Sequence, residues 1–360
     1  MKLRKIIKTY YNKLVHSFFF IIYGKIEQKK LNLKKIFINN VYKIDKFCVR
    51  KFNYKVFQIK NGRVFTNFVE SLAIILDNKI LNEISFQQVN GYLKQNKNEV
   101  LLSGTPKFKR KLFGTTLVLT QGASGHSNYA HWLLDIIPKI IITSKVHDLK
   151  NIDNFYFSKL NNFQKEALRY MKINPGKFID ANKFRHIECQ NLLAVTHPNY
   201  FKKTIFDAHS NIPAWIIYLL KKKFLNKKLK KIKFNKIFID RGDSKQSHCK
   251  LINNTSVINL LKKKGYKVLQ LSDFRFFDQI SIFRNCNKII SPHGAGLANL
   301  IFCKPGTQVI EIIPDNITNL VYKRISNINK LKHKAIYVKK IKNNINGDMY
   351  FDLDKFNHLF

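Results

Sequence analysis

A short run of small residues at positions 291–299 has the composition of a phosphate-binding turn. The apolar run before it ends at Pro292, His293 supplies a hydrogen-bond donor, and Gly294 and Gly296 leave space beside the backbone amides. An apolar helical pattern follows, and the first N–H groups of a helix attract anions together with the positive end of its dipole. The run therefore predicts a site for phosphate or pyrophosphate. Its spacing alone fits equally an ordinary strand-to-helix turn in which the glycines serve only the geometry.

A histidine and an aspartate four residues apart, His131 and Asp135, form a second candidate site. Side chains at i and i+4 share one face of a helix, and Asn128 is a suitable N-cap for that helix. A carboxylate that orients an imidazole raises its basicity, so the pair could remove a proton from a hydroxyl group. Either residue stays open as the base. A histidine buried for packing alone is the alternative, and His126, in the preceding loop, is a weaker candidate.

Strands and helices alternate around the glycine turn. The expected strands cover residues 236–240, 266–271, 288–291 and 308–313, and the expected helices cover residues 257–264 and 274–285 and begin again after the turn. This alternation indicates an α/β architecture with a parallel sheet, on which ligands bind at the carboxyl ends of the strands. Arg241, the glycine turn and Glu311 lie at such ends, so we expect them at one edge of the sheet.

The chemistry expected at this edge is nucleotide binding. An arginine, a histidine and a helix N-terminus together suit a nucleotide diphosphate. Glu311 would accept hydrogen bonds from ribose hydroxyls or, alternatively, pair with a lysine. The turn has no Walker lysine, carries Asn299 in place of the third glycine of G-x-G-x-x-G, and has no acidic ribose-binding residue at the usual distance. These features disfavour a kinase or a dehydrogenase, which are the alternative nucleotide-binding α/β enzymes.

Residues 237–311 resemble the family 61 glycosyltransferases, often described in bacteria as capsular-polysaccharide biosynthesis proteins. The matching residues are Arg241, Lys250, Asn253, Gly265, Tyr266, Gln279, the PHGAGL run at 292–297, Asn299, Leu300, the PGT run at 305–307 and Glu311. Residues 128–135 resemble the family's second signature, and residues 348–353 resemble its C-terminal end. Two positions depart from the pattern. Lys250 stands where arginine is usual, which keeps the charge but loses the bidentate fork, and Asn254 stands where glutamate is usual.

The resemblance implies an inverting glycosyltransferase (a hexosyl- or pentosyltransferase) with the GT-B fold, in which two Rossmann-like domains face each other across a cleft. It implies a nucleotide-sugar donor, usually UDP-linked, and a glycan or lipid-linked acceptor in surface polysaccharide such as capsule or lipopolysaccharide. It makes His131 and Asp135 the catalytic pair. The residues expected to bind the donor and its pyrophosphate are Arg241, Lys250, His293, Gly294, Ala295, Gly296, Leu297, Asn299 and Glu311. No metal or other cofactor is expected, because the helix dipole, His293 and Arg241 can stabilise the leaving diphosphate.

The length of 360 residues and the hydrophobic share of 45% favour two packed domains. We expect a basic, aromatic segment at 1–34, an acceptor-side α/β domain at 35–230, a Rossmann-like donor domain at 231–316, and a tail at 317–360 that GT-B chains often pack back on the first domain. The boundary is placed in the lysine-rich segment 221–234. Strands of the first domain are expected at 54–59, 72–76, 116–120, 155–157 and 192–195.

The net charge of +43 predicts that the chain attracts anions such as anionic lipid headgroups and nucleotide-sugars. The excess is carried by 55 lysines against 10 arginines and is spread over the whole sequence, which is untypical of a specific nucleic-acid site. A nonenzymatic protein that binds RNA or a membrane surface through charge is the remaining alternative class. That alternative leaves both candidate sites unexplained.

Basic residues flank an apolar run at 18–23 near the N-terminus. The run is too short to span a bilayer, and no small-residue cleavage site follows it, so we expect neither a membrane span nor a signal peptide. Two interpretations stay open: the segment lies in a membrane interface, or it packs as the first helix of the N-terminal domain. Five cysteines without C-x-x-C spacing suit a reducing cytoplasm, where a peripheral position on the inner face of the membrane is one option.

Overall fold

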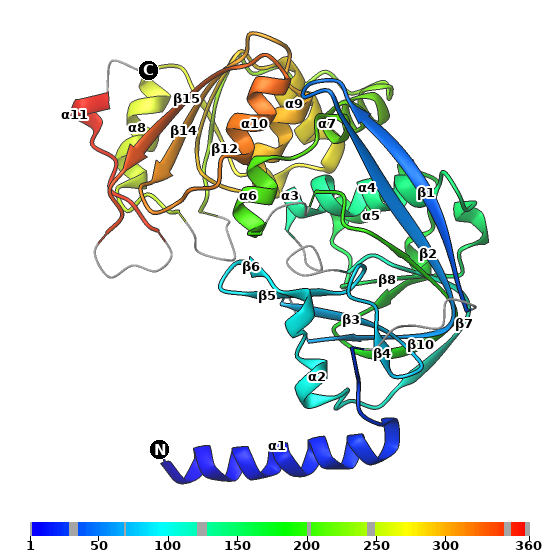
Figure 1. Cartoon of the computed structure of the whole chain (residues 1–360). Coiled ribbons are helices and arrows are strands. Elements are labelled where there is room, and N and C mark those ends of the chain that lie inside the picture. Colours follow the sequence, from blue (N-terminus) through cyan, green and yellow to red (C-terminus); the bar gives the residue numbers. More distant parts are fainter. Residues whose placement is uncertain are drawn as a thin grey trace. The chain divides into compact units, whose positions relative to one another are not determined.

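The computed structural model describes residues 2–28, 35–67, 70–120, 128–199, 203–242, 249–341 and 347–356. It divides into two compact units, each with its own sheet (Figure 1). The first unit holds residues 1–44, 51–161 and 168–205, and the second holds residues 45–50, 162–167 and 206–360. The second unit therefore begins upstream of residue 231, where the sequence places the domain boundary, and it includes two short segments from the first half of the chain.

A ten-stranded mixed sheet forms the first unit. Its main strands run in the order β6 (Tyr92–Leu93), β5 (Phe86–Val89), β3 (Ser71–Leu76), β2 (Arg50–Thr66), β10 (His186–Val195), β7 (Arg110–Val118), β8 (Asn154–Phe157) and β9 (Phe178–Asp180). In addition, β1 (Ile36–Asp45) pairs with β2, and β4 (Lys79–Ile80) pairs with β3. The strands β10, β7, β8 and β9 are parallel, whereas β2, β3, β5 and β6 pair antiparallel.

The first sheet is therefore not the fully parallel, Rossmann-like sheet expected for this part of the chain. Four of the five expected strands lie within β2, β3, β8 and β10, and the fifth, 116–120, overlaps the end of β7 at Val118. Two of the sheet's antiparallel pairs, β3 with β4 and β5 with β6, arise because tight turns fold the chain straight back. Asp77 and Asn78 between β3 and β4, and Asn90 and Gly91 between β5 and β6, all have positive φ, as two-residue hairpin turns require.

Helices of the first unit are short, apart from the first one. They are α1 (Lys2–Tyr23), η2 (Gln95–Lys97), α2 (Val100–Ser103), α3 (Tyr129–His131), η4 (Trp132–Ile136), α4 (Ile137–Thr143), η5 (Leu149–Asn151) and η6 (Pro175–Lys177). The helix α5 (Asn162–Tyr170) is divided between the two units. Buried side chains from neighbouring strands, including Ile59, Ile74 and Leu192, form the core of the sheet.

The second unit is a parallel five-stranded sheet, which confirms the expected α/β class. Its strands run in the order β12 (Lys267–Leu269), β11 (Lys236–Ile239), β13 (Lys288–Pro292), β14 (Gln308–Pro314) and β15 (Lys332–Val338). Counted along the chain this is the doubly wound order 2-1-3-4-5. In such sheets the winding reverses between the first and third strands, and ligands bind at the carboxyl ends there. The reversal point lies between β11 and β13.

Helices cover both faces of the second sheet (Figure 1). They are α6 (Ile205–Ser210), α7 (Ala214–Leu225), α8 (Asn254–Lys263), η7 (Leu271–Asp273), α9 (Phe276–Asn285), η8 (Ala295–Phe302), α10 (Val321–Ile328) and α11 (Leu353–Phe356). On one face, Val257 and Leu261 of α8 pack with Phe238, Ile290 and Ile312 from three strands. The helix after the glycine turn, η8, is a 3₁₀ helix.

Residues 317–360 differ from the expected tail. They supply α10 and β15 to the second unit, where β15 pairs in parallel with β14 along seven residues. Adding β15 covers the edge that β14 would otherwise leave open. Within the described ranges, no helix is both long enough and apolar enough to cross a membrane.

Candidate functional site

An arginine and a histidine meet where the second sheet reverses its winding. Arg241 follows β11 and His293 follows β13, and Nη1 of Arg241 donates a hydrogen bond to the carbonyl oxygen of His293. Asp240, just before the arginine, accepts hydrogen bonds from the main-chain N–H of Gly242 at 3.0 Å and from the side-chain amides of Asn254 at 2.9 Å and Gln270 at 3.0 Å. These bonds fix the backbone that carries the guanidinium. The expected meeting of Arg241 with the glycine turn is therefore present.

In its observed position the side chain of Arg241 leaves no room for a Cβ on Gly294. A Cβ placed on Gly294 would lie 1.2 Å from Nη1 of Arg241, so any other residue would displace the guanidinium. A Cβ on Gly296 would lie 2.5 Å from Cδ1 of Leu271, which is the end of a flexible side chain. Directly after Gly294 the 3₁₀ helix η8 begins, and the first N–H groups of a helix have no partner within it. The turn thus combines a cation with backbone donors, which suits an anion.

His293 belongs to a buried group of two histidines and one glutamate. Its Nδ1 lies 2.6 Å from Oε1 of Glu311, whose Oε2 lies 2.9 Å from Nε2 of His333. Burial alone would raise the pKa of Glu311, but the hydrogen bonds and charges of the two histidines outweigh it and lower that pKa. Tyr322 packs against the ring of His293 with centroids 5.1 Å apart. The carboxylate therefore stays ionised and holds the imidazole in one orientation.

Glu311 has different partners from those that the sequence suggests. Its side chain is 2% exposed and both oxygens are taken by histidines, so it faces neither a surface lysine nor solvent where a ribose would bind. Sequence reasoning missed His333, because this residue comes 22 positions later on a strand that was not expected. The parallel pairing of β14 with β15 brings it next to Glu311.

The other residues expected to bind the donor divide into two groups. Ala295 and Gly296 lie partly exposed at the start of η8, whereas Leu297 and Asn299 are buried inside the unit. Asn299 donates hydrogen bonds to Oε1 of Gln279 and to the carbonyl oxygen of Gly296, both at 3.1 Å. Asn299 therefore stabilises the glycine turn from its buried side.

Lys250 lies beside the C-terminal segment. Its main-chain N–H donates to Oδ1 of Asp348 at 3.0 Å, and its neighbour Leu251 bridges to Met349. Asn254, the departure from the family pattern, donates to Oδ1 of Asp240. A glutamate there would meet that carboxylate with a like charge, so the amide fits this chain.

In the first unit, His131 and Asp135 lie side by side on a helix that changes its winding. The side chain of Asn128 accepts hydrogen bonds from the N–H groups of Ala130 and His131, as expected for its N-cap. A π-helical segment, η4, follows, in which the N–H of Ile137 reaches the carbonyl of Trp132 five residues back. Pro138 has no N–H and its ring clashes with an ordinary helical turn, which the wider π turn relieves. Such turns are frequent at functional sites.

Asp135 is at the centre of the candidate site in the first unit. Its side chain is fully buried, with Oδ2 2.7 Å from Nδ1 of His131 and Oδ1 accepting a hydrogen bond of 2.6 Å from the amide of Asn199. Nε2 of His197 lies 3.9 Å from Oδ2. The imidazole of His131 is 16% exposed. The buried carboxylate can therefore orient the histidine, while only the histidine reaches the surface.

Asn199 and His197 were not among the expected site residues. These two residues follow β10 and contact Asp135, more than 60 positions earlier in the chain. No local spacing in the sequence indicates such a contact. His126 lies outside the described residues.

Lys139 lies within the same buried region, and we expect it to make stability depend on pH. Desolvation lowers the pKa of its ammonium to about 7, although the charge of Asp135 acts in the opposite direction. In the unfolded chain this pKa is near 10.5, so the unfolded state binds more protons between pH 7 and 10. The free energy of unfolding of the wild type should therefore rise with pH in this window, by at most roughly 1.4 kcal/mol per pH unit.

The matched variant for this prediction is Lys139→Met, which keeps the length of the side chain and removes the proton. Chemical unfolding of both proteins from pH 6.5 to 10 gives the difference in unfolding free energy, in which titration of all other groups cancels. The unfolding free energy of the wild type should increase relative to that of Lys139→Met as the pH rises. A difference that is flat across the window would show that Lys139 keeps an ordinary pKa in the fold.

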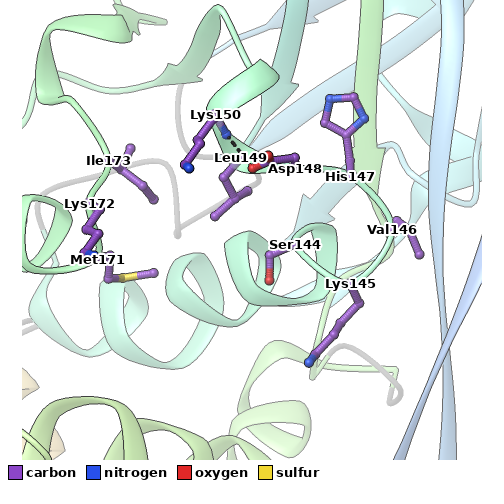
Figure 2. A pocket seen from close by; sticks show the side chains of 10 residues that line it. All are labelled: Ser144, Lys145, Val146, His147, Asp148, Leu149, Lys150, Met171, Lys172 and Ile173. Atoms are coloured by element: carbon purple, nitrogen blue, oxygen red, sulfur yellow. Dashed lines mark hydrogen bonds between the residues drawn. The ribbon is translucent and has the colours of Figure 1, made fainter.

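A surface cavity of about 570 Å³ in the first unit lies apart from these residues (Figure 2). It is lined by residues 144–150 and 171–173, three of which are lysines, and the main-chain N–H of Lys150 donates to Oδ1 of Asp148 at 3.0 Å on its wall. None of the residues expected in a site lines it.

The comparison with protein-family models agrees with the resemblance in the sequence. The family model described as Glycosyltransferase 61 matches residues 129–310, which is half of the chain and includes His131, Asp135, Arg241 and His293. Among solved structures, the chain is similar to a mutant flavo di-iron protein from Thermotoga maritima, at 11% identity over 90% of this chain and 98% of that one, with a TM-score of 0.24. No curated protein gives a match. By its match over residues 129–310, the chain belongs to glycosyltransferase family 61 and is a glycosyltransferase.

Proposed function

We propose that this glycosyltransferase moves a sugar with inversion from a nucleotide-diphosphate donor, UDP-linked, to a glycan or lipid-linked acceptor in surface polysaccharide biosynthesis. The observation that carries the proposal is the contact of Arg241 with the glycine turn at the reversal point of a doubly wound sheet. The leaving group of the reaction is a diphosphate, and this edge offers a guanidinium, an imidazole and the amides at the start of η8.

In this proposal the donor site works by electrostatic stabilisation. As the bond between the sugar and the diphosphate breaks, negative charge grows on the departing oxygen, and Arg241 and His293 lie fixed around that charge. Glu311 and His333 act as positioning residues, since they hold the ring of His293 and touch no ligand themselves. The proposal requires no metal ion, because these groups supply the positive charge.

We assign the role of base to His131 and a positioning role to Asp135. With Nδ1 directed at the buried carboxylate, the proton-accepting nitrogen of the neutral ring is Nε2. That nitrogen would take the proton from the acceptor hydroxyl while its oxygen bonds to the anomeric carbon and the nucleotide diphosphate leaves. Asp135 is fully buried, so it cannot reach an acceptor itself.

We also propose a domain assignment and a location for the protein. The two units would correspond to the two domains of the GT-B fold, with the first on the acceptor side, and the protein would act on the cytoplasmic face of the membrane. The support for the two-domain assignment is the division into units with separate sheets.

The function is tested by following release of UDP from UDP-glucose, UDP-galactose and UDP-N-acetylglucosamine with chelator present and water as the acceptor. We expect slow release from at least one donor, and the freed sugar should first appear as the β anomer, because inversion at an α-linked donor gives that product. The α anomer as first product would contradict inversion. Release that requires an added divalent metal would contradict the metal-independent mechanism.

A further inference from the structure

The first helix of the chain carries an apolar stripe that faces solvent. Ile7, Leu14, Phe18 and Ile21 recur at helical spacing on α1, and all four side chains are at least half exposed, Leu14 at 71% and Ile21 at 86%. Tyr10 and Tyr11 flank the stripe and are also exposed. Large apolar side chains gathered on one exposed face mark an interaction surface.

The opposite side of α1 attaches the helix to the first unit. Phe19 is buried and its ring lies 5.1 Å from that of Phe108, measured between centroids. Tyr23 accepts a hydrogen bond of 3.0 Å from the N–H of Lys109, and its ring meets His186 edge to face at 4.8 Å. These contacts anchor the last turns of α1. Of the stripe, Phe18 also meets the ring of Phe108, with centroids 6.4 Å apart, whereas Ile7, Leu14 and Ile21 are the more exposed members.

Charge identifies the kind of partner that fits this stripe. Residues 2–23 contain four lysines and one arginine and no acidic residue. Lys8 and Asn12 lie on the polar side, and Arg4 lies near the edge of the stripe in the first turn. A basic helix with an aromatic and aliphatic face lies in the plane of an anionic bilayer, with the apolar face at the level of the acyl chains. At 22 residues the helix is about 33 Å long.

We propose that α1 docks on the surface of an anionic phospholipid bilayer, lying in the interface with Ile7, Leu14, Phe18 and Ile21 toward the acyl chains. The anchored turns on the opposite side then hold the first unit at that surface. The proposal does not depend on the donor site. It concerns the location at which the enzyme works. An enzyme docked in this way would meet a lipid-linked acceptor at the membrane surface.

The test is co-sedimentation of the full chain with vesicles of phosphatidylcholine alone and of phosphatidylcholine with phosphatidylglycerol. The net charge of +43 attracts anionic vesicles whatever α1 does, so the decisive comparison is between variants of equal charge. The stripe variant combines Ile7→Asn with Leu14→Asn, and the control is Asn12→Gln on the polar side. Circular dichroism and the affinity for UDP check that each variant keeps its fold.

We expect the stripe variant to bind anionic vesicles at least about tenfold more weakly than the wild type, because burying one aliphatic side chain is worth about a factor of ten or more. The Asn12→Gln control should bind anionic vesicles as tightly as the wild type does. The wild type and the stripe variant should both bind only weakly to neutral vesicles. Equal binding of the stripe variant and the wild type would overturn the proposal. A wild type that forms dimers without vesicles, and loses them in the stripe variant, would also overturn it, in favour of a second copy as the occupant.

Discussion

Replacing His131 by alanine is expected to reduce sugar transfer by about a hundred- to ten-thousandfold while leaving the affinity for UDP unchanged. Losses of this size are typical when a general base is removed. The side chain reaches the surface beside a carboxylate that is fully buried, so it is the member of the pair that an acceptor hydroxyl can meet. Steady-state rates of UDP release and calorimetric affinities for UDP, measured on the same preparations, separate the two effects.

Asp135→Asn provides the matched test of the positioning role. The amide keeps the size of the side chain, but its NH₂ group can turn toward Nδ1 of His131 and stabilise the wrong tautomer. We expect a loss in the maximal rate without loss of UDP affinity. His16→Ala, a histidine replacement on α1, serves as a control and should leave the rate unchanged. If His131→Ala weakens UDP binding and the maximal rate survives, the residue is a ligand of the donor and the base lies elsewhere.

The second large effect is expected at a glycine. Gly294→Ala should weaken UDP binding by about tenfold to a hundredfold, because its Cβ would occupy the place of Nη1 of Arg241 and drive the guanidinium off the site. Losing one hydrogen bond between a charged donor and the diphosphate accounts for an effect of this size. Gly296→Ala is the matched comparison, since its Cβ also meets the end of a flexible side chain, but that side chain is Leu271, which is not a proposed ligand of the diphosphate. Its effect on affinity should be clearly smaller.

A double-mutant cycle isolates the clash itself. Gly294→Ala should cost unfolding free energy in the wild-type background and much less in an Arg241→Ala background, where the colliding atoms are gone. Equal costs in both backgrounds would mean that the alanine disturbs the turn for another reason. UDP affinity in Gly294→Ala at the wild-type level would contradict the assignment of Arg241 to the donor.

The second unit was largely predictable from the sequence because its strands are buried runs separated by helical periodicity. The expected strands around Arg241, His293 and Glu311 are present as β11, β13 and β14. Since parallel strands end at one edge, the meeting of Arg241 with the glycine turn followed from the pattern alone. The 3₁₀ geometry of η8 could not be predicted, because an apolar run after a glycine turn is compatible with an α-helix and with a 3₁₀ helix.

The first unit was less predictable for two physical reasons. The antiparallel strands β4, β5 and β6 have only two to four residues each, and the turn signals at 77–78 and 90–91 were the features that could have found them. The contacts of Asp135 with Asn199 and of Glu311 with His333 join residues far apart in the sequence, so only the pairing of strands and helices in space creates them. Local spacing predicted the pair His131 and Asp135, but not the residues that hold it.

The central claim is a nucleotide-diphosphate site at the reversal point of the second sheet, and calorimetry with UDP, GDP, CDP and ADP tests it most directly. The measurement uses the full chain at moderate salt with chelator present, beside Arg241→Ala as the variant and circular dichroism as the check on folding. The account predicts selective binding of UDP that withstands added salt and is lost in the variant. Weak and equal binding of all four nucleotides that fades with salt would contradict it, because a lysine-rich surface alone binds anions in that way.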